Sequence, residues 1–164
     1  MDHSQLGGML AATVAELERV GAADEALGVL QEGRGIGRLR GQPKLVPVGR
    51  AWRLGVVLLD RSGALFATGE ITRAIEPQVA VTNRSAAAEL KREYRRAAVR
   101  GPFPAGETIN HEFAPIDLGE SALGTGSGPL SLGDDGTVLV RLPSGSRVPL
   151  DTYLADRVAL FSLD

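Results

Sequence analysis

Cysteine is absent from this 164-residue sequence, and histidine occurs only twice, as His3 and His111. A chain without cysteine has no disulfides, no thiolate nucleophile and no cysteine-ligated metal. This composition suits the reducing cytosol. The two histidines are not accompanied by further residues at metal-ligand spacing, so the sequence predicts no metal site and no cofactor.

Long apolar runs are also absent. The longest, residues 55–59, has the length of a strand and is far shorter than the ~20 residues of a membrane span. The first 20 residues include acidic side chains and lack the basic region of a signal peptide. We therefore expect a cytoplasmic protein with no membrane association.

The familiar catalytic and nucleotide-binding motifs are missing as well. Residues 33–38 read GRGIGR, but a dinucleotide fingerprint starting at Gly33 needs glycine where Arg38 stands. No serine lies in a G-x-S-x-G elbow or is followed three residues later by lysine. The glycine-rich segment 124–128 is interpreted as part of a flexible loop over residues 119–128. The sequence thus favours a non-catalytic role.

Aromatic residues make up only 4% of the chain, whereas 43% of it is hydrophobic, so the core must be mainly aliphatic. The length suits a single domain over residues 1–164. Within it we distinguish a helical N-terminal segment, residues 1–33, and an α+β core, residues 44–164. A glycine-rich connector lies between them.

Hydrophobic periodicity predicts the secondary structure. Two helices, over residues 4–20 and 23–30, form an N-terminal helical hairpin. Residues 86–99 form a central helix capped by Asn83 or Ser85, and a C-terminal helix begins at Asp151. Continuous strands are predicted over residues 51–59 and 107–118. The two β-hairpins join residues 51–59 to 64–71 and residues 130–132 to 137–142. This order favours an α+β fold with a largely antiparallel sheet.

Charge is segregated along the chain. Residues 34–100 contain fourteen Lys or Arg against five acids, whereas both flanking segments are acidic. Arginine suits bidentate contact with carboxylate or phosphate. If the central helix lies across the first hairpin, its arginines and those beside the single tryptophan can converge on one small anion. The predicted ligand-binding residues are Arg50, Trp52, Arg53, Arg73 and Arg95. The simpler interpretation is that these arginines are solvated and pair with the acidic flanks.

General acid–base chemistry has few candidates. His111 is followed by Glu112, but neighbours along a strand point to opposite faces. Another carboxylate, such as Glu70 on the first hairpin, would have to face His111. We name His111, Glu70 and Glu112 as the candidates for a catalytic base, and we predict no established catalytic set.

Four blocks of the sequence resemble a family of small uncharacterised actinobacterial proteins. They are VPVGRAWRLGVVLLD, ALFATGEITRA, SAAAELKREYRRAAVRGPFPAGETI and the C-terminal series GPL, VRLPSG and PLDTYLADRVAL. The resemblance covers roughly residues 35–161. Some members are labelled glutaminase, which implies hydrolysis of a small amide. The Ser-x-x-Lys and cysteine nucleophiles of known glutaminases do not occur here.

Three functions follow in order of preference. The first is a non-catalytic domain that binds a partner or a small anion and forms a homodimer. The second is a glutaminase-like amide hydrolase with a carboxylate or histidine base. The third is weak nucleic-acid binding through the basic middle segment, which the net charge of −2 disfavours.

Overall fold

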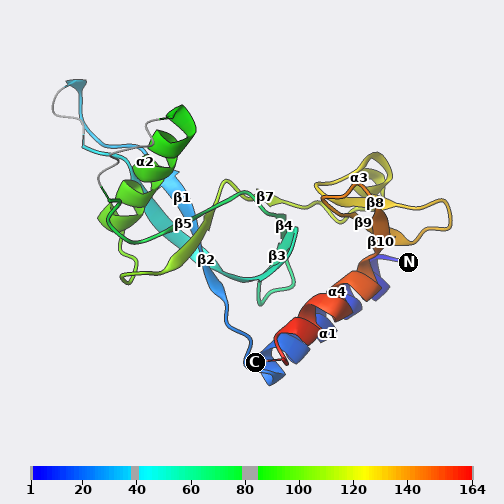
Figure 1. The fold of residues 1–164 in the computed structure, drawn as a ribbon. Coiled ribbons are helices and arrows are strands. Elements are labelled where there is room, and N and C mark those ends of the chain that lie inside the picture. Colours follow the sequence, from blue (N-terminus) through cyan, green and yellow to red (C-terminus); the bar gives the residue numbers. More distant parts are fainter. Residues whose placement is uncertain (1, 38–40, 79–84, 164) are drawn as a thin grey trace. The chain divides into compact units, whose positions relative to one another are not determined.

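The computed structural model describes residues 2–37, 41–78 and 85–163, which form four helices and ten strands (Figure 1). The α+β class and the largely antiparallel pairing are as predicted. The chain divides into two compact units. Unit 1 comprises residues 1–24, 51–68 and 113–164, and unit 2 comprises residues 25–50 and 69–112. The prediction of a single domain over residues 1–164 stays a prediction. Among the described residues, no helix is long and apolar enough to cross a membrane.

Unit 1 begins with helix α1, His3–Arg19. The Asp2 side chain accepts a hydrogen bond from the Gln5 amide at 2.7 Å, and the Gln5 side chain accepts one from the Asp2 amide, so the N-terminus has a capping box. Leucines at helical spacing face the core. Helix α4, Leu150–Leu160, packs against α1. The buried side chains of α1 are Leu6, Leu10, Val14 and Leu17.

A meander of short strands crosses the middle of unit 1. It contains residues 51–54 of β2 (Lys44–Leu54), then β3 (Val57–Leu59), β4 (Leu65–Ala67) and β7 (Ala114–Pro115). The prediction of one continuous strand over residues 51–59 is wrong. Gly55 has φ 68° and turns the chain, so that Leu54 pairs with Val57 and Trp52 with Leu59. A β-carbon on Gly55 would lie 2.2 Å from the Tyr153 hydroxyl, so this turn requires glycine.

A second, three-stranded sheet completes unit 1. Its order is β10 (Arg147–Pro149), β9 (Val138–Arg141) and β8 (Leu130–Leu132). Residues 119–128, predicted to be a flexible loop, contain helix α3, Glu120–Thr125. Burial of Leu123 anchors this short helix, and Glu120 lies at its N-terminus, where the helix dipole favours an acid. The prediction was wrong because it was based on the many glycines of this segment, whereas one buried leucine is enough to hold a short helix.

Unit 2 is a four-stranded arrangement with one helix. The strand order is β5 (Glu70–Arg73), β6 (Thr108–His111), β1 (Glu25–Gln31) and residues 44–50 of β2. Helix α2, Ala86–Arg100, packs against this sheet, where it contacts β5. Its N-cap is Ser85, whose hydroxyl accepts a hydrogen bond from the Ala88 amide at 3.2 Å. The alternative cap, Asn83, lies outside the described residues. The core of unit 2 is small: Ala26, Leu45, Ala74, Ala97, Ala98 and Ile109, with Phe103 against them.

The predicted N-terminal helical hairpin is wrong, because residues 25–31 form strand β1 rather than a second helix. β1 pairs in parallel with β6, with Ala26 opposite Ile109. A β-carbon on Gly28 would lie 2.7 Å from the Ile109 side chain, so this glycine allows the two strands to pack closely. The alanines and leucines of this segment fit either a short helix or a strand, and pairing with residues about 80 positions away decides between them.

The predicted strand over residues 107–118 is also divided. β6 ends at His111 and β7 starts at Ala114, with Glu112 between them at φ 55°. Glu112 has the one positive φ among the described non-glycine residues. Gly101 ends α2 in an extended conformation, φ −77° and ψ 167°.

Candidate functional site

The single tryptophan is a core residue of unit 1. Trp52 is 1% exposed, and its indole N–H donates to the Ala22 carbonyl at 2.9 Å. The Arg61 guanidinium carbon lies 4.6 Å from the centre of the indole ring. Trp52, which the sequence predicted to bind a ligand, therefore has protein groups in contact with both its ring and its N–H. Arg53 belongs to the same unit, is partly buried and pairs in register with Leu58.

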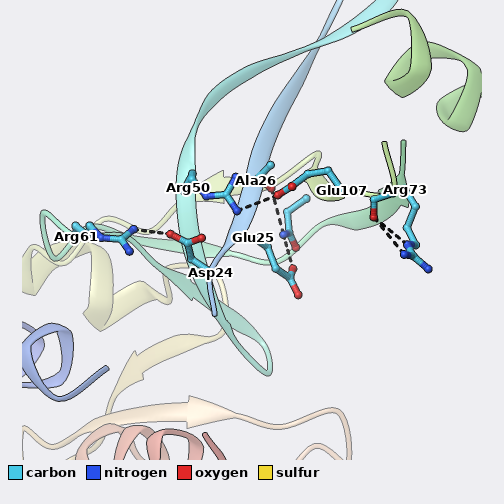
Figure 2. Close-up of polar contacts among 9 residues, drawn as sticks. Asp24, Glu25, Ala26, Arg50, Arg61, Arg73 and Glu107 are labelled. Atoms are coloured by element: carbon cyan, nitrogen blue, oxygen red, sulfur yellow. Dashed lines mark hydrogen bonds and ion pairs between the residues drawn. The ribbon is translucent and has the colours of Figure 1, made fainter. Parts of the chain in front are cut away.

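Three of the predicted arginines lie in unit 2, and two of them contact neighbouring residues of one segment (Figure 2). Arg50 forms an ion pair with Glu107 at 2.9 Å, and Arg73 donates to the Gly106 carbonyl at 3.2 and 3.3 Å. Arg95 is exposed on α2. The structure thus brings Arg50 and Arg73 to the same short segment before β6. It also gives each of them an acceptor within the protein.

Two other arginines of α2 form ion pairs within the helix itself, whereas Arg100 donates to the Pro43 carbonyl. Arg92 pairs with Glu89 at 2.8 Å, and Arg96 pairs with both Glu89 and Glu93. Ion pairs at this spacing offset the basic charge that could otherwise contact phosphates. The basic middle of the sequence is therefore less basic as a surface than its composition suggests.

The acid–base candidates named from the sequence come together in unit 2, where they form what we call the His111 group: Glu70, Tyr94, His111 and Glu112. Glu70 is the register partner of His111 across β5 and β6. The Tyr94 ring stacks on the imidazole, with centroids 4.2 Å apart and an interplanar angle of 27°. The Tyr94 hydroxyl donates to Glu112 Oε1 at 2.6 Å. The sequence suggested that Glu70 could face His111, but it gave no sign that Tyr94 covers the ring.

Electrostatics within the His111 group is set by burial of its histidine. His111 is 2% exposed, and its Nδ1 is buried with no hydrogen-bond partner within the described chain. Burial lowers the pKa of His111, and the nearby carboxylates of Glu112 and Glu70 oppose this shift. The hydrogen bond to Glu112, together with desolvation, raises the pKa of Tyr94 to about 12. At neutral pH the group therefore contains a neutral imidazole and a neutral phenol.

The backbone beside the His111 group is unusually tight. Gly69 lies so close to the turn after β6 that a β-carbon would approach the Glu112 carbonyl oxygen to 2.3 Å and the His111 carbonyl oxygen to 2.4 Å. Glu112 itself adopts the left-handed region, which costs free energy for a residue other than glycine.

The face of the unit 2 sheet that points away from α2 is what we call the open sheet face. Its residues are Glu25, Leu27, Val29, Val46, Val48, Ile71, Arg73 and Asn110. Ala26, Leu45 and Ile109 pack toward α2, so alternation places their neighbours on the other side. Ile71 is the register partner of Asn110 and so shares this face. The Asn110 amide donates to Glu25 Oε2 at 2.7 Å and to the Ala26 carbonyl at 3.4 Å (Figure 2).

Three aliphatic side chains on the open sheet face are accessible, whereas Leu27 on the same face is 4% exposed. Val29 is 41% exposed, Val48 53% and Ile71 45%. Single exposed aliphatics are ordinary, but several on one sheet face are a feature of interaction surfaces. The sequence contained this signal in the alternation of β1 and β2, but the prediction of a helix over residues 23–30 hid it.

No group of three or more potential metal-ligating side chains occurs in the parts of the chain that the structure describes. Comparison with known protein families, with curated proteins and with solved structures found no match to this chain. Inferences about function therefore depend on the chain's own geometry.

Proposed function

We propose that this chain is a non-catalytic binding domain and that its open sheet face binds the same face of a second copy. The observation that supports this proposal is the exposure of Val29, Val48 and Ile71 on one face. Covering three aliphatic side chains gives a favourable term of roughly 25 cal/mol for each Å² of apolar area removed from water. An interface of this kind would have an apolar centre.

Charge on the open sheet face favours a second copy over a partner of one sign. Glu25 and Arg73 both lie on it, so a two-fold arrangement can place the acid of one copy near the base of the other. A face with charge of a single sign would repel itself. The resulting interface would be isologous, with each residue contacting the same patch on its partner.

Light scattering at micromolar concentrations tests this proposal. We expect twice the monomer mass for the wild type and the monomer mass for Val48→Asp and for Ile71→Asp. Leu90→Asp is the matched control, because Leu90 is 58% exposed on α2 and lies away from the open sheet face. A monomeric wild type, or a dimer that survives both aspartates, would contradict the proposal.

The second candidate function is hydrolysis of a small amide at the His111 group. Its support is that the three bases named from the sequence come together, with Glu70 in register with His111 and both carboxylates close enough to influence the pKa of His111. A neutral imidazole can accept a proton from an attacking water. Ammonia release from glutamine should then occur in the wild type and disappear in His111→Ala and Glu70→Ala. A wild type that releases no ammonia from glutamine rejects this activity.

A further inference from the structure

Two arginines face each other across the small sheet of unit 1. Arg141 on β9 and Arg147 on β10 are direct register partners. Val138 and Val140 of β9 are buried in the core, so alternation places Arg141 on the outer face of this sheet, together with Arg147. Directly opposed residues on neighbouring antiparallel strands have β-carbons roughly 5 Å apart, and like charges at such positions destabilise the sheet.

Neither of these two guanidinium groups has a hydrogen bond or an ion pair with any described residue of the chain. This distinguishes them from the arginines that pair with a carboxylate: Arg19, Arg50, Arg61, Arg92 and Arg96. The turn that joins their two strands, residues 142–146, has no acidic side chain. The protein itself therefore does not offset the repulsion between Arg141 and Arg147.

Both arginines line a cavity of about 370 Å³. Its other walls include Thr125, Gly126, Gly128 and Ser131. Gly126 and Gly128 have φ 99° and 56°, conformations that bring backbone into the wall without side chains. Ser131 adds a hydroxyl group, which can donate a hydrogen bond. The volume falls at the lower end of the range typical of sites for small molecules.

We infer that this cavity binds a small phosphorylated molecule, with Arg141 and Arg147 holding its phosphate group between them. A phosphate monoester carries close to two negative charges at neutral pH, which matches two guanidinium charges, whereas a carboxylate carries one. Placed between the arginines, it converts their repulsion into charge-assisted hydrogen bonds. The rest of the cavity has room for the group that the phosphate is attached to. This site is in unit 1 and does not depend on the dimer or on the His111 group.

Isothermal titration calorimetry with inorganic phosphate and with glucose 6-phosphate tests the inference, with glucose as the uncharged control. We expect the sugar phosphate to bind and glucose not to bind. Inorganic phosphate should bind more weakly than the sugar phosphate, because it leaves the rest of the cavity empty. Arg141→Gln and Arg147→Gln should each weaken binding by about tenfold or more, because each removes charge-assisted hydrogen bonds. Arg95→Gln, an exposed arginine of unit 2, should bind like the wild type.

Thermal unfolding supplies a second, independent measurement. Without ligand, Arg141→Gln and Arg147→Gln should melt at or above the temperature of the wild type, because either change removes the like-charge contact. With glucose 6-phosphate the melting temperature should rise in the wild type and not in these two variants. The inference is overturned if neither phosphate compound binds the wild type, or if both arginine variants bind as well as the wild type does. Loss of binding in Arg95→Gln alone would instead place the anion in unit 2.

Discussion

The hydroxyl of Tyr153 connects helix α4 to the turn between β2 and β3, and its removal should destabilise unit 1 measurably. Tyr153 is 3% exposed; its hydroxyl donates to the Leu54 carbonyl at 2.8 Å and accepts from the Val56 amide at 2.9 Å. Tyr153→Phe would leave both backbone groups without this partner. A buried polar group left unpaired costs about 1–3 kcal/mol. Because Val56 is only partly buried, we expect a total loss of about 2–3 kcal/mol in the free energy of unfolding.

Urea unfolding followed by Trp52 fluorescence measures this loss, since Trp52 lies in the core of the same unit. For a chain of this length, it corresponds to a fall in melting temperature of about 5–10 °C. Tyr94→Phe is the matched control, since it removes one hydroxyl whose acceptor, Glu112, is exposed. Water can replace that bond, so we expect the free energy of unfolding to fall by only about 0.5 kcal/mol. Urea unfolding monitored by circular dichroism measures this change.

Gly55 allows a sharper test of the same contact. Gly55→Ala places a β-carbon 2.2 Å from the Tyr153 hydroxyl and also strains a residue at φ 68°. In a Tyr153→Phe background the strain stays but the contact with the hydroxyl is gone, so Gly55→Ala should cost less there. If the two substitutions are additive, or if Tyr153→Phe unfolds within about 0.5 kcal/mol of the wild type, the bridging role of this hydroxyl is refuted.

Three further predictions concern unit 2. Gly69→Ala should lower the free energy of unfolding by about 3 kcal/mol, because backbone carbonyls of Glu112 and His111 cannot yield to the new methyl group; urea unfolding followed by circular dichroism checks this, and a neutral effect would contradict it. The pKa of His111 is lowered by burial, so its contribution to stability is present above its ordinary value of 6.5 and is lost as the pH falls through its lower folded-state pKa. His111→Gln should therefore lose less stability than the wild type between neutral and acidic pH, and identical acid profiles would refute this. The pKa of Tyr94 is raised from 10.0 to about 12, so the protein should lose stability as the pH rises through this range, and Tyr94→Phe should lose less.

Local patterns in the sequence predicted the elements whose stability is local. Helix α2 followed from its periodicity, its cap at Ser85 and the glycine after Arg100. The same rules failed for residues 25–31, because their strand depends on a parallel partner at residues 108–111. They also failed at Glu112, since nothing in its local sequence indicates a left-handed residue.

The candidate sites show the same division. The sequence allowed the proposal that Glu70 faces His111, and the two residues are register partners across β5 and β6. Opposition of Arg141 and Arg147 could be expected from the sequence, because residues 143–146, PSGS, are typical of a turn between two paired strands. The cavity beside them could not be predicted, because its walls include residues of α3 and the segment after it, which the glycine content indicated to be a flexible loop.

The difference between the two cores has a consequence for motion. The core of unit 1 contains Trp52, Tyr153 and many leucines, whereas that of unit 2 depends largely on alanine. Regions with little buried apolar area open at lower free energy and exchange their backbone amide protons sooner. Hydrogen–deuterium exchange should therefore be faster in β5, β6 and α2 than in α1 and α4. In such an opening His111 would reach solvent while Trp52 stayed enclosed, so tryptophan fluorescence would not detect the event.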